Sequence, residues 1–250
     1  MVERRTIGLI GCAIAMTLAL DAGAGPSQGP PADVTNLVPN KQEVGHPYEG
    51  VVALINANSP QDSLFHGQFC GGALISPTIV VTAAHCVFGR TAPQVLVADH
   101  VDDLCSASWA STSKVTAIDT MPGSRGEVAV LSLAEASHVQ PLERSKADSP
   151  GRARAYGWGP SSPGGVPPCR LRWVDSVVVP LEICRDSLDQ FGRLPTASEL
   201  CAVAREGDVC GGDSGGPLID ASGRLLGLVS WGPACGGGLP TVYADMRERG

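Results

Sequence analysis

Asp208-Val-Cys-Gly-Gly-Asp-Ser-Gly-Gly-Pro217 is the most informative stretch of the sequence. Its serine, Ser214, lies among glycines, which let a substrate approach the hydroxyl group closely. The backbone N–H groups of Gly212 and Ser214 can converge on one point and stabilise a negatively charged oxygen there. The stretch therefore predicts a serine nucleophile with its own oxyanion donors.

A serine hydroxyl needs a base to act as a nucleophile, and Thr82-Ala-Ala-His-Cys86 supplies a candidate in His85. Histidine can accept the hydroxyl proton near neutral pH and return it to a leaving group. Gly212-x-Ser214-x-Gly216 also fits the nucleophile turn of α/β-hydrolases, but those enzymes place the histidine after the serine. The last histidine here is His138, so the order of the residues argues against that class.

Short β-branched apolar runs separated by turn residues predict an all-β barrel or sandwich. The turns draw on 31 glycines and 20 prolines. A short amphipathic helix is expected from Pro180 to Phe191, with Gly192 as its stop. The predicted strands cover residues 51–55, 79–83, 95–98, 115–118, 128–133, 174–179 and 225–230.

Length and charge limit the function classes. The 250 residues, 43% of them hydrophobic, suffice for one sizeable domain or two small ones. Lys and Arg total 18 against 25 Asp and Glu, which gives a net charge of −7. This balance argues against nucleic acid or an anionic membrane surface as a partner.

The N-terminus has the layout of a secretory signal peptide over residues 1–24: two arginines, an apolar run over 7–20 and small residues before the expected cleavage. The run is short for a membrane span, and no later segment reaches spanning length. A lipobox-like Leu9-Ile-Gly-Cys12 makes lipid anchoring at Cys12 a less favoured alternative, because the apolar run continues past it. Residues 25–44 are expected to be a proline-rich leader, and the mature chain is expected to be secreted.

Eight cysteines remain beyond Cys12, and an even number in an exported chain favours four disulfides. The spacings typical of zinc sites, Cys-x-x-Cys and His-Glu-x-x-His, do not occur, so no metal is expected. The eight are Cys70, Cys86, Cys105, Cys169, Cys184, Cys201, Cys210 and Cys235.

Five motifs together resemble the trypsin/chymotrypsin-like serine protease family, over residues 45–246. They are Phe69-Cys-Gly-Gly-Ala-Leu-Ile75, Thr82-Ala-Ala-His-Cys86, Gly157-Trp-Gly159, Gly212-Asp-Ser-Gly-Gly-Pro217 and Ser230-Trp231-Gly232. The resemblance implies an all-β fold of two six-stranded antiparallel barrels, at about 45–145 and 146–250, with the active site in the cleft between them. It also implies a monomer that acts on polypeptide substrates and can be bound by protein inhibitors. It implies no cofactor.

The resemblance also implies residue roles. Ser214 would be the nucleophile of a serine endopeptidase, His85 its general base and acid, and the amides of Gly212 and Ser214 the oxyanion donors. Ser230, Trp231 and Gly232 would hydrogen-bond an extended substrate as an added strand. The implied disulfides are Cys70–Cys86, Cys184–Cys201 and Cys210–Cys235, which leaves Cys105 and Cys169 as the fourth pair.

The chain departs from the family where the third member of the catalytic triad is expected. The family has an aspartate before an apolar strand, whereas this chain has Glu127 before residues 128–131. Glutamate has the same charge and can accept from the ring N–H of His85, but its extra methylene moves the carboxylate by more than an ångström. A misplacement of that size can cost about a hundredfold in rate. We assign the histidine-orienting role to Glu127, with Asp119 as the alternative.

The primary specificity pocket gives mixed signals. Asp208, six residues before Ser214, lies where trypsin-like enzymes place the carboxylate that binds Arg or Lys, and Gly232 leaves the pocket mouth open. Thr241 stands where trypsin has a second pocket glycine, and its β-branched side chain would narrow the channel. We expect cleavage after Arg or Lys, with small or unusual residues as the alternative.

Activation is the third departure. Family members expose an Ile-Val-Gly-Gly terminus whose ammonium pairs with the aspartate before the nucleophile, here Asp213, and no such tetrapeptide precedes Pro47. A buried carboxylate without partners would be costly, and the sequence does not show which groups pair with Asp213. The sequence also ends soon after Met246, so we expect the family's closing C-terminal helix to be short or missing. These departures leave a catalytically silent homologue that binds protein as the alternative function.

Overall fold

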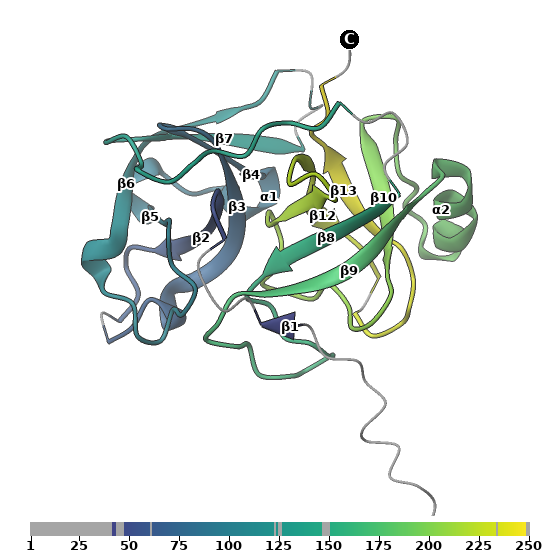
Figure 1. Ribbon diagram of the computed structural model, residues 1–250, viewed down its shortest axis with the longest axis horizontal. Helices are drawn as coiled ribbons and strands as arrows, with labels where there is room; N and C mark the ends of the chain where they lie inside the picture. The colour runs from purple at the N-terminus through teal and green to yellow at the C-terminus, as the bar shows by residue number, and fades with distance from the viewer. Residues whose placement is uncertain are drawn as a thin grey trace, which may run out of the picture. The chain divides into compact units, whose positions relative to one another are not determined.

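The computed structural model describes residues 42–43, 48–60, 62–122, 124, 127–146, 151–233 and 235–248. The predicted signal peptide, Cys12 and most of the predicted leader lie outside these residues. Two antiparallel β-barrels make up most of what is described (Figure 1).

The first barrel closes six strands in the order β2-β3-β4-β7-β6-β5. Its interior is filled by fully buried aliphatic side chains such as Leu54, Leu74 and Leu131. Leu54 and Leu131 belong to apolar runs that predicted strands, whereas Leu74 lies in a strand that no such run predicted. The strands are β2 (Val51–Asn56), β3 (Gln68–Ser76), β4 (Ile79–Ala83), β5 (Val95–Ala98), β6 (Thr112–Thr120) and β7 (Val128–Leu133).

The second barrel closes in the order β9-β10-β13-β12-β11-β8, because β8 also pairs with β9. A seventh strand, β1 (Gln42–Glu43), extends this sheet at β9. The barrel strands are β8 (Arg152–Gly157), β9 (Arg172–Val179), β10 (Glu199–Ala204), β11 (Pro217–Asp220), β12 (Leu225–Trp231) and β13 (Thr241–Asp245). The expected fold of two six-stranded antiparallel barrels is confirmed.

Helical segments are short. α1 (Ala84–Val87) follows β4 directly, and α2 (Leu181–Leu188) continues into the 3-10 turn η5 (Asp189–Phe191). Gly192 ends this segment with φ of +71°, a left-handed conformation that favours glycine, so the predicted helix and its stop are confirmed. The other 3-10 turns are η2 (Phe65–Gly67), η3 (Ala92–Gln94) and η4 (Trp109–Ser111).

The apolar runs found seven of the strands, but not all of them. β3 contains two glycines, and β8 alternates alanine with arginine, so neither has the β-branched run that was sought. β1 consists of two exposed polar residues inside the predicted leader. It is a strand because β9 pairs with it, and Arg172 of β9 forms an ion pair with Glu43 at 3.4 Å. Pairing of this kind leaves no local signal in the sequence.

Four disulfides are present, in the implied pairs. Three lie within one barrel each: Cys70–Cys86, Cys184–Cys201 and Cys210–Cys235. The fourth, Cys105–Cys169, joins the two barrels. Its 64-residue separation corresponds to a stabilisation of about 4 kcal/mol in the chain-entropy estimate.

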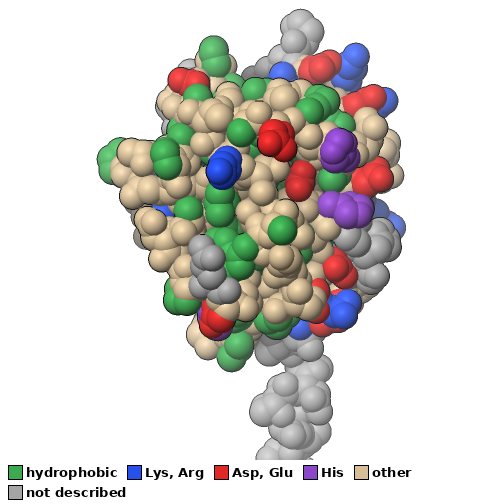
Figure 2. Space-filling model, turned by 90° about the vertical axis from the view of Figure 1, so that its left-hand side faces the viewer, with side chains coloured by type: hydrophobic (Ala, Val, Ile, Leu, Met, Phe, Trp, Pro, Cys, Tyr) green, Lys and Arg blue, Asp and Glu red, His purple; other side chains and the backbone are tan. Residues whose placement is uncertain are grey.

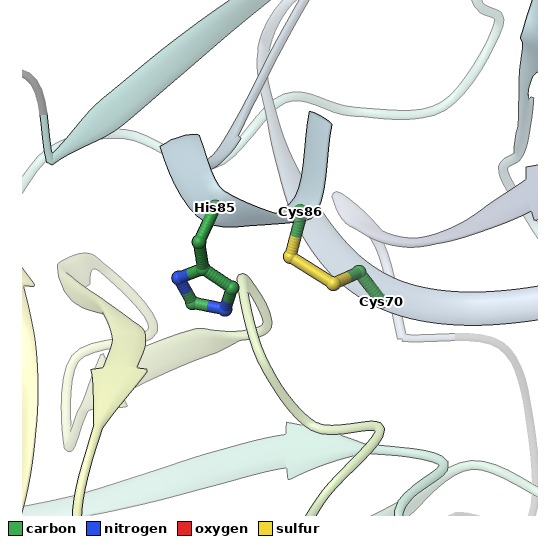
Figure 3. Close-up of side chains that lie close together, drawn as sticks. All are labelled: Cys70, His85 and Cys86. Atoms are coloured by element: carbon green, nitrogen blue, oxygen red, sulfur yellow. A yellow bond between two sulfur atoms is a disulfide. The ribbon is translucent and has the colours of Figure 1, made fainter. Parts of the chain in front are cut away.

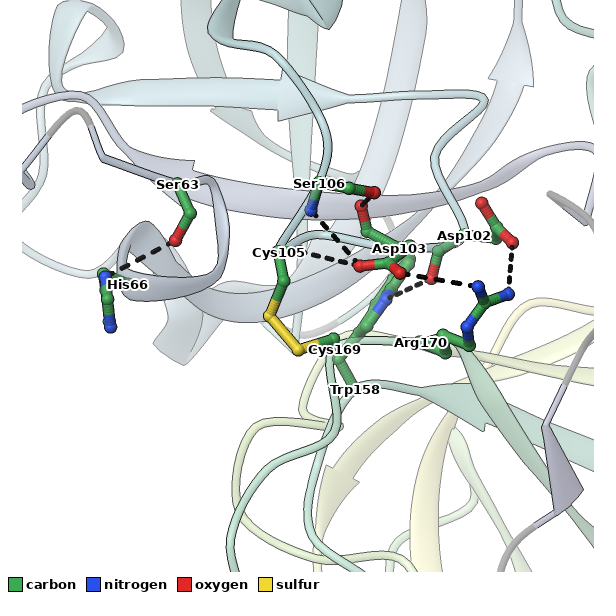
Figure 4. The surroundings of a disulfide bond; sticks show 9 residues. All are labelled: Ser63, His66, Asp102, Asp103, Cys105, Ser106, Trp158, Cys169 and Arg170. Atoms are coloured by element: carbon green, nitrogen blue, oxygen red, sulfur yellow. Dashed lines mark hydrogen bonds and ion pairs between the residues drawn. A yellow bond between two sulfur atoms is a disulfide. The ribbon is translucent and has the colours of Figure 1, made fainter.

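Hydrogen bonds and an ion pair between the two barrels surround the Cys105–Cys169 disulfide (Figure 4). The Leu104 N–H donates to Cys169 O at 2.9 Å, and Trp158 Nε1 donates to Asp102 O at 3.3 Å. Arg170 forms an ion pair with Asp102 at 3.5 Å. Backbone and side chains of both barrels therefore fix their relative placement, on which a site between them depends.

The surface of the first barrel carries few cations. Figure 2 shows this side of the molecule, where two histidines lie toward one edge, acidic side chains are spread over the face, and one Lys or Arg side chain stands alone near the middle. In the described part of the chain, no helix has the length and apolar character needed to cross a membrane.

Candidate active site

His85 lies on α1, immediately after β4. The helix is tied to the end of β7, because the Ala84 N–H donates to Glu127 O at 2.9 Å. Figure 3 shows the His85 ring extending from α1 beside the Cys70–Cys86 disulfide. The histidine is exposed, so its ring is open to a ligand.

The Ser214 segment of the second barrel contacts the first barrel through backbone atoms. The Gly71 N–H donates to Ser214 O at 2.8 Å, and Thr82 Oγ1, three residues before His85, donates to Gly71 O at 2.8 Å. A Cβ atom on Gly71 would lie 2.9 Å from Gly216 Cα, so only glycine permits this approach. These bonds bring the segments of His85 and Ser214 to one place.

The proposed oxyanion donors are available. Where the chain is described, the N–H groups of Gly212 and Ser214 donate to no protein acceptor. Gly212 has φ of +98°, which a residue with a side chain rarely adopts. Gln68 Nε2 donates to Gly212 O at 3.0 Å and to Cys70 O at 3.2 Å, so the first barrel fixes the peptide of this glycine.

The buried Asp213 carboxylate accepts backbone hydrogen bonds. Gly159 N donates to Oδ1 and Cys210 N to Oδ2, both at 2.8 Å. A Cβ on Gly159 would lie 2.6 Å from the carboxyl carbon, and one on Gly157 would also collide with the carboxylate. The Gly157-Trp-Gly159 motif thus makes room for Asp213 and supplies one of its donors. Two backbone N–H groups therefore stabilise the Asp213 carboxylate, although the chain has no Ile-Val-Gly-Gly terminus before Pro47 to pair with it.

Glu127 is held by side chains. Ser230 Oγ donates to Glu127 Oε2 at 3.4 Å, and Arg193 Nη2 lies 3.8 Å from the same oxygen. One third of the Glu127 side chain is exposed. Among the described residues, no hydrogen bond joins His85 to Glu127 or to Ser214. The three groups are therefore not linked in a hydrogen-bonded relay.

Electrostatics nevertheless couples these groups. Partial removal of water by the surrounding protein lowers the pKa of His85 below its ordinary value, the Glu127 charge raises it, and the Arg193 charge lowers it. Asp119, the alternative to Glu127, is an exposed residue of β6 and is not among the groups that shift the His85 pKa. Glu127 is the carboxylate that acts on His85 in this structure.

Asp208 is buried. Val209 N donates to Asp208 Oδ1 at 2.7 Å, and Gly236 N donates to Oδ2 at 2.6 Å. A Cβ on Gly232 would lie 3.7 Å from Thr241 Oγ1, so the threonine side chain lies next to this glycine. A carboxylate has about four acceptor positions, and two of them are used here.

Comparison with known proteins decides the family. The Trypsin family profile matches residues 41–248. A trypsin from Saccharopolyspora erythraea is 35% identical over 192 residues, which cover 72% of this chain and 82% of the relative. Trypsin alpha-4 from Lucilia cuprina is 34% identical, with 71% and 73% covered. A trypsin from Sarcophaga bullata is 31% identical over 95% of this chain and 91% of its own length.

The chain belongs to the trypsin family. As a member of the trypsin family it is a serine endopeptidase, and its substrates are polypeptides. The alternative of a silent binding homologue is not favoured by these comparisons.

Two groups of potential metal ligands occur among the described residues of this trypsin-family chain. One consists of Cys70, His85 and Cys86, whose ligand atoms lie within 4.8 Å of one another, and the other of Asp103, Cys105 and Cys169. The sulfur atoms of both groups are already joined in disulfides. Because the thiolate is the metal-binding form of cysteine, neither group is a metal site.

Sequence reasoning missed three residues of this trypsin-family site. Gln68 directly precedes a motif but has no chemical signature of its own. Arg193 lies in the loop between η5 and β10, and Glu199 is the first residue of β10. A charged residue in such a place is normally solvated. Glu199 is instead 2% exposed, and its Oε1 accepts from Trp231 Nε1 at 2.7 Å. These contacts are visible only in the folded structure, because no local sequence pattern indicates them.

Proposed function

We propose that the protein hydrolyses peptide bonds through an acyl-enzyme formed on Ser214. Ser214 Oγ attacks the peptide carbonyl carbon while His85 takes the hydroxyl proton, and the Gly212 and Ser214 amides hold the negative oxygen. His85 then gives its proton to the leaving amine. Water, activated by the same histidine, releases the carboxylic acid product and restores the serine.

The observation that carries this assignment is the backbone link between the two barrels. The Gly71 N–H donates to Ser214 O, and Gly71 O accepts from Thr82 on the strand that leads to His85. The two proposed groups thus come from different barrels, and their segments are linked through Gly71 by one main-chain bond and one bond from the Thr82 hydroxyl. The unoccupied N–H groups of Gly212 and Ser214 support the oxyanion role.

Glu127 is proposed to orient His85 and to stabilise its protonated ring. The support is its bond from Ser230, its backbone link to α1 and its charge effect on His85. The proposed role requires a hydrogen bond between Glu127 and His85 to form in the substrate complex, because none joins them among the described residues. Catalytic hydrogen bonds often shorten when substrate binds.

Cleavage after Arg or Lys is proposed from Asp208. Its charge lies in a buried position, and two acceptor positions remain beyond the backbone bonds from Val209 and Gly236. Relatives of this chain are named trypsins. Thr241 narrows this channel, so the long side chain of the substrate must pass its methyl and hydroxyl groups.

Secretion is proposed as well. Four disulfides suit an oxidising compartment, and the named relatives are trypsins. The residues of the expected signal peptide are the additional support from the sequence.

The nucleophile is tested by titrating the disulfide-bonded protein with a fluorophosphonate probe. We expect one label for each molecule, located on Ser214 by peptide mass mapping, and none on Ser214→Ala. A folded wild-type protein that takes no label would contradict the proposed role of Ser214.

The pocket is tested with Asp208→Ser in a mixed peptide library. Loss of the buried charge should abolish the preference for Arg and Lys while Ser214 still reacts with the probe. If Asp208→Ser kept the preference, the residue that selects cations would lie elsewhere.

A further inference from the structure

Arg193 lies beside the proposed catalytic residues, although no step of the reaction uses it. It follows Gly192, at the end of the α2–η5 segment. Its guanidinium carbon stands 4.3 Å from the centroid of the Trp231 ring, and 53% of its side chain is exposed. Stacking on an aromatic face holds the cation in place while its outer side is open to a ligand.

The acidic neighbours of Arg193 are at long range. Its Nη2 atom lies 3.8 Å from Glu127 Oε2 and 3.8 Å from Glu199 Oε1, beyond hydrogen-bond distance. Glu199 is already engaged, because Thr196 N donates to its Oε2 at 2.7 Å and Trp231 donates to its Oε1. In the part of the chain that is described, Arg193 donates no hydrogen bond. Its five N–H groups are therefore available to a bound acceptor.

The ligand chemistry follows from this geometry. A guanidinium binds a carboxylate best through two parallel hydrogen bonds, which neither Glu127 nor Glu199 supplies. We propose that Arg193 is a specificity-determining residue that binds an acidic side chain of the substrate, N-terminal to the cleaved bond. The inference rests on the proposed function, since it takes Ser230 to Gly232 as the edge along which the substrate extends.

The position of that acidic side chain follows from strand geometry. Successive side chains of an extended peptide point to opposite sides. The residue before the cleaved bond directs its side chain toward Asp208, so the residues two and four positions before the bond point the other way. Arg193 lies 3.8 Å from Glu127, and the charges of both residues act on His85, so we place Arg193 and the Trp231 ring on the His85 side of the peptide. A substrate carboxylate there would also draw Arg193 away from Glu127. Glu127 would then be free of this cation and could accept the ring N–H of His85.

The test measures kcat/KM for peptide pairs that differ only in Glu or Gln at the second or fourth position before the cleaved bond. The parent peptide is one that the wild type cleaves at a single bond, chosen from a mixed library, so the test does not depend on the Arg or Lys preference. We expect about a fivefold preference for Glu at one of the two positions, which is the upper range for an exposed ion pair. The preference should disappear in Arg193→Gln and weaken in 0.5 M salt.

Arg205→Gln is the matched control, because it removes the same charge from an exposed site at the end of β10 and should keep the preference. Equal rates for Glu and Gln in the wild type, or a preference that persists in Arg193→Gln, would overturn the proposal. Ser214 labelling is run on each variant. An unlabelled wild type contradicts the proposed function itself, whereas a labelled, active enzyme without the Glu preference contradicts only the role of Arg193.

Discussion

Two carboxylates near the proposed nucleophile are held in different ways. Asp213 is 2% exposed and accepts from two backbone N–H groups at 2.8 Å. Glu127 is one-third exposed and has a hydroxyl at 3.4 Å and a guanidinium at 3.8 Å as its neighbours. The Asp213 region is fixed by the main chain and by glycines, whereas the Glu127 region depends on side chains that can rotate.

The difference separates a preorganised part of the site from an adjustable part. Oxyanion donors must be in place before the charge develops, and backbone bonds to Asp213 fix the peptide that leads into Ser214. The Glu127 side chain is able to respond to the substrate, because each of its side-chain contacts is long. Even a small change in the first region should therefore slow the reaction, whereas a conservative change in the second should only tune it.

The largest effect is expected for Glu127→Ala, which removes the charge that supports protonated His85. The expected loss in kcat is about 10³-fold or more, as for loss of the orienting group in a catalytic triad. Glu127→Asp should keep or raise the turnover, because the family's usual carboxylate then stands in the site. The check is steady-state kinetics on a peptide substrate, with Asp119→Ala as the control on β6. An unchanged rate for Glu127→Ala would remove Glu127 from the mechanism.

A smaller loss is expected for Gly159→Ala, whose new Cβ would meet the Asp213 carboxylate. Displaced Asp213 moves the neighbouring Ser214 amide, and loss of one oxyanion donor costs about 10²–10³-fold in rate. The rate of fluorophosphonate labelling measures this effect. Gly151→Ala is the control, because a Cβ at Gly151 meets no atom within 4 Å. Equal labelling rates for the two variants would show that the Asp213 region tolerates movement.

The smallest effect is a displacement of the pH profile. The catalytic base is neutral His85, so the acid limb of kcat/KM against pH follows its pKa. Arg193 lowers that pKa, so Arg193→Gln should move the acid limb to higher pH. Glu127 raises it, so Glu127→Gln should move the acid limb of the residual activity to lower pH. Shifts of the same sign in both variants would contradict the assignment of the limb to His85.

Local patterns in the sequence predicted much of the fold. Runs such as 51–55 and 128–133 became strands because their β-branched side chains fill a barrel interior. The helix before Gly192 was also predicted, since its apolar spacing and its stop are local features. β1 and β8 were not, because their pairing partners, and not their own residues, make them strands.

The sequence by itself determined which chemistry is available: a serine among glycines, a histidine before it in the chain and an aspartate, Asp208, six residues before the serine. Motifs of this kind are readable because each places its reactive group within a few residues. Only the tertiary structure decided what surrounds that chemistry. Gly159 meets Asp213, and Arg193 meets Trp231 and Glu127, across separations of 38 to 66 residues that no local pattern can encode. Such contacts depend on how the strands and loops pack, and they set how the site is held and which substrates it prefers.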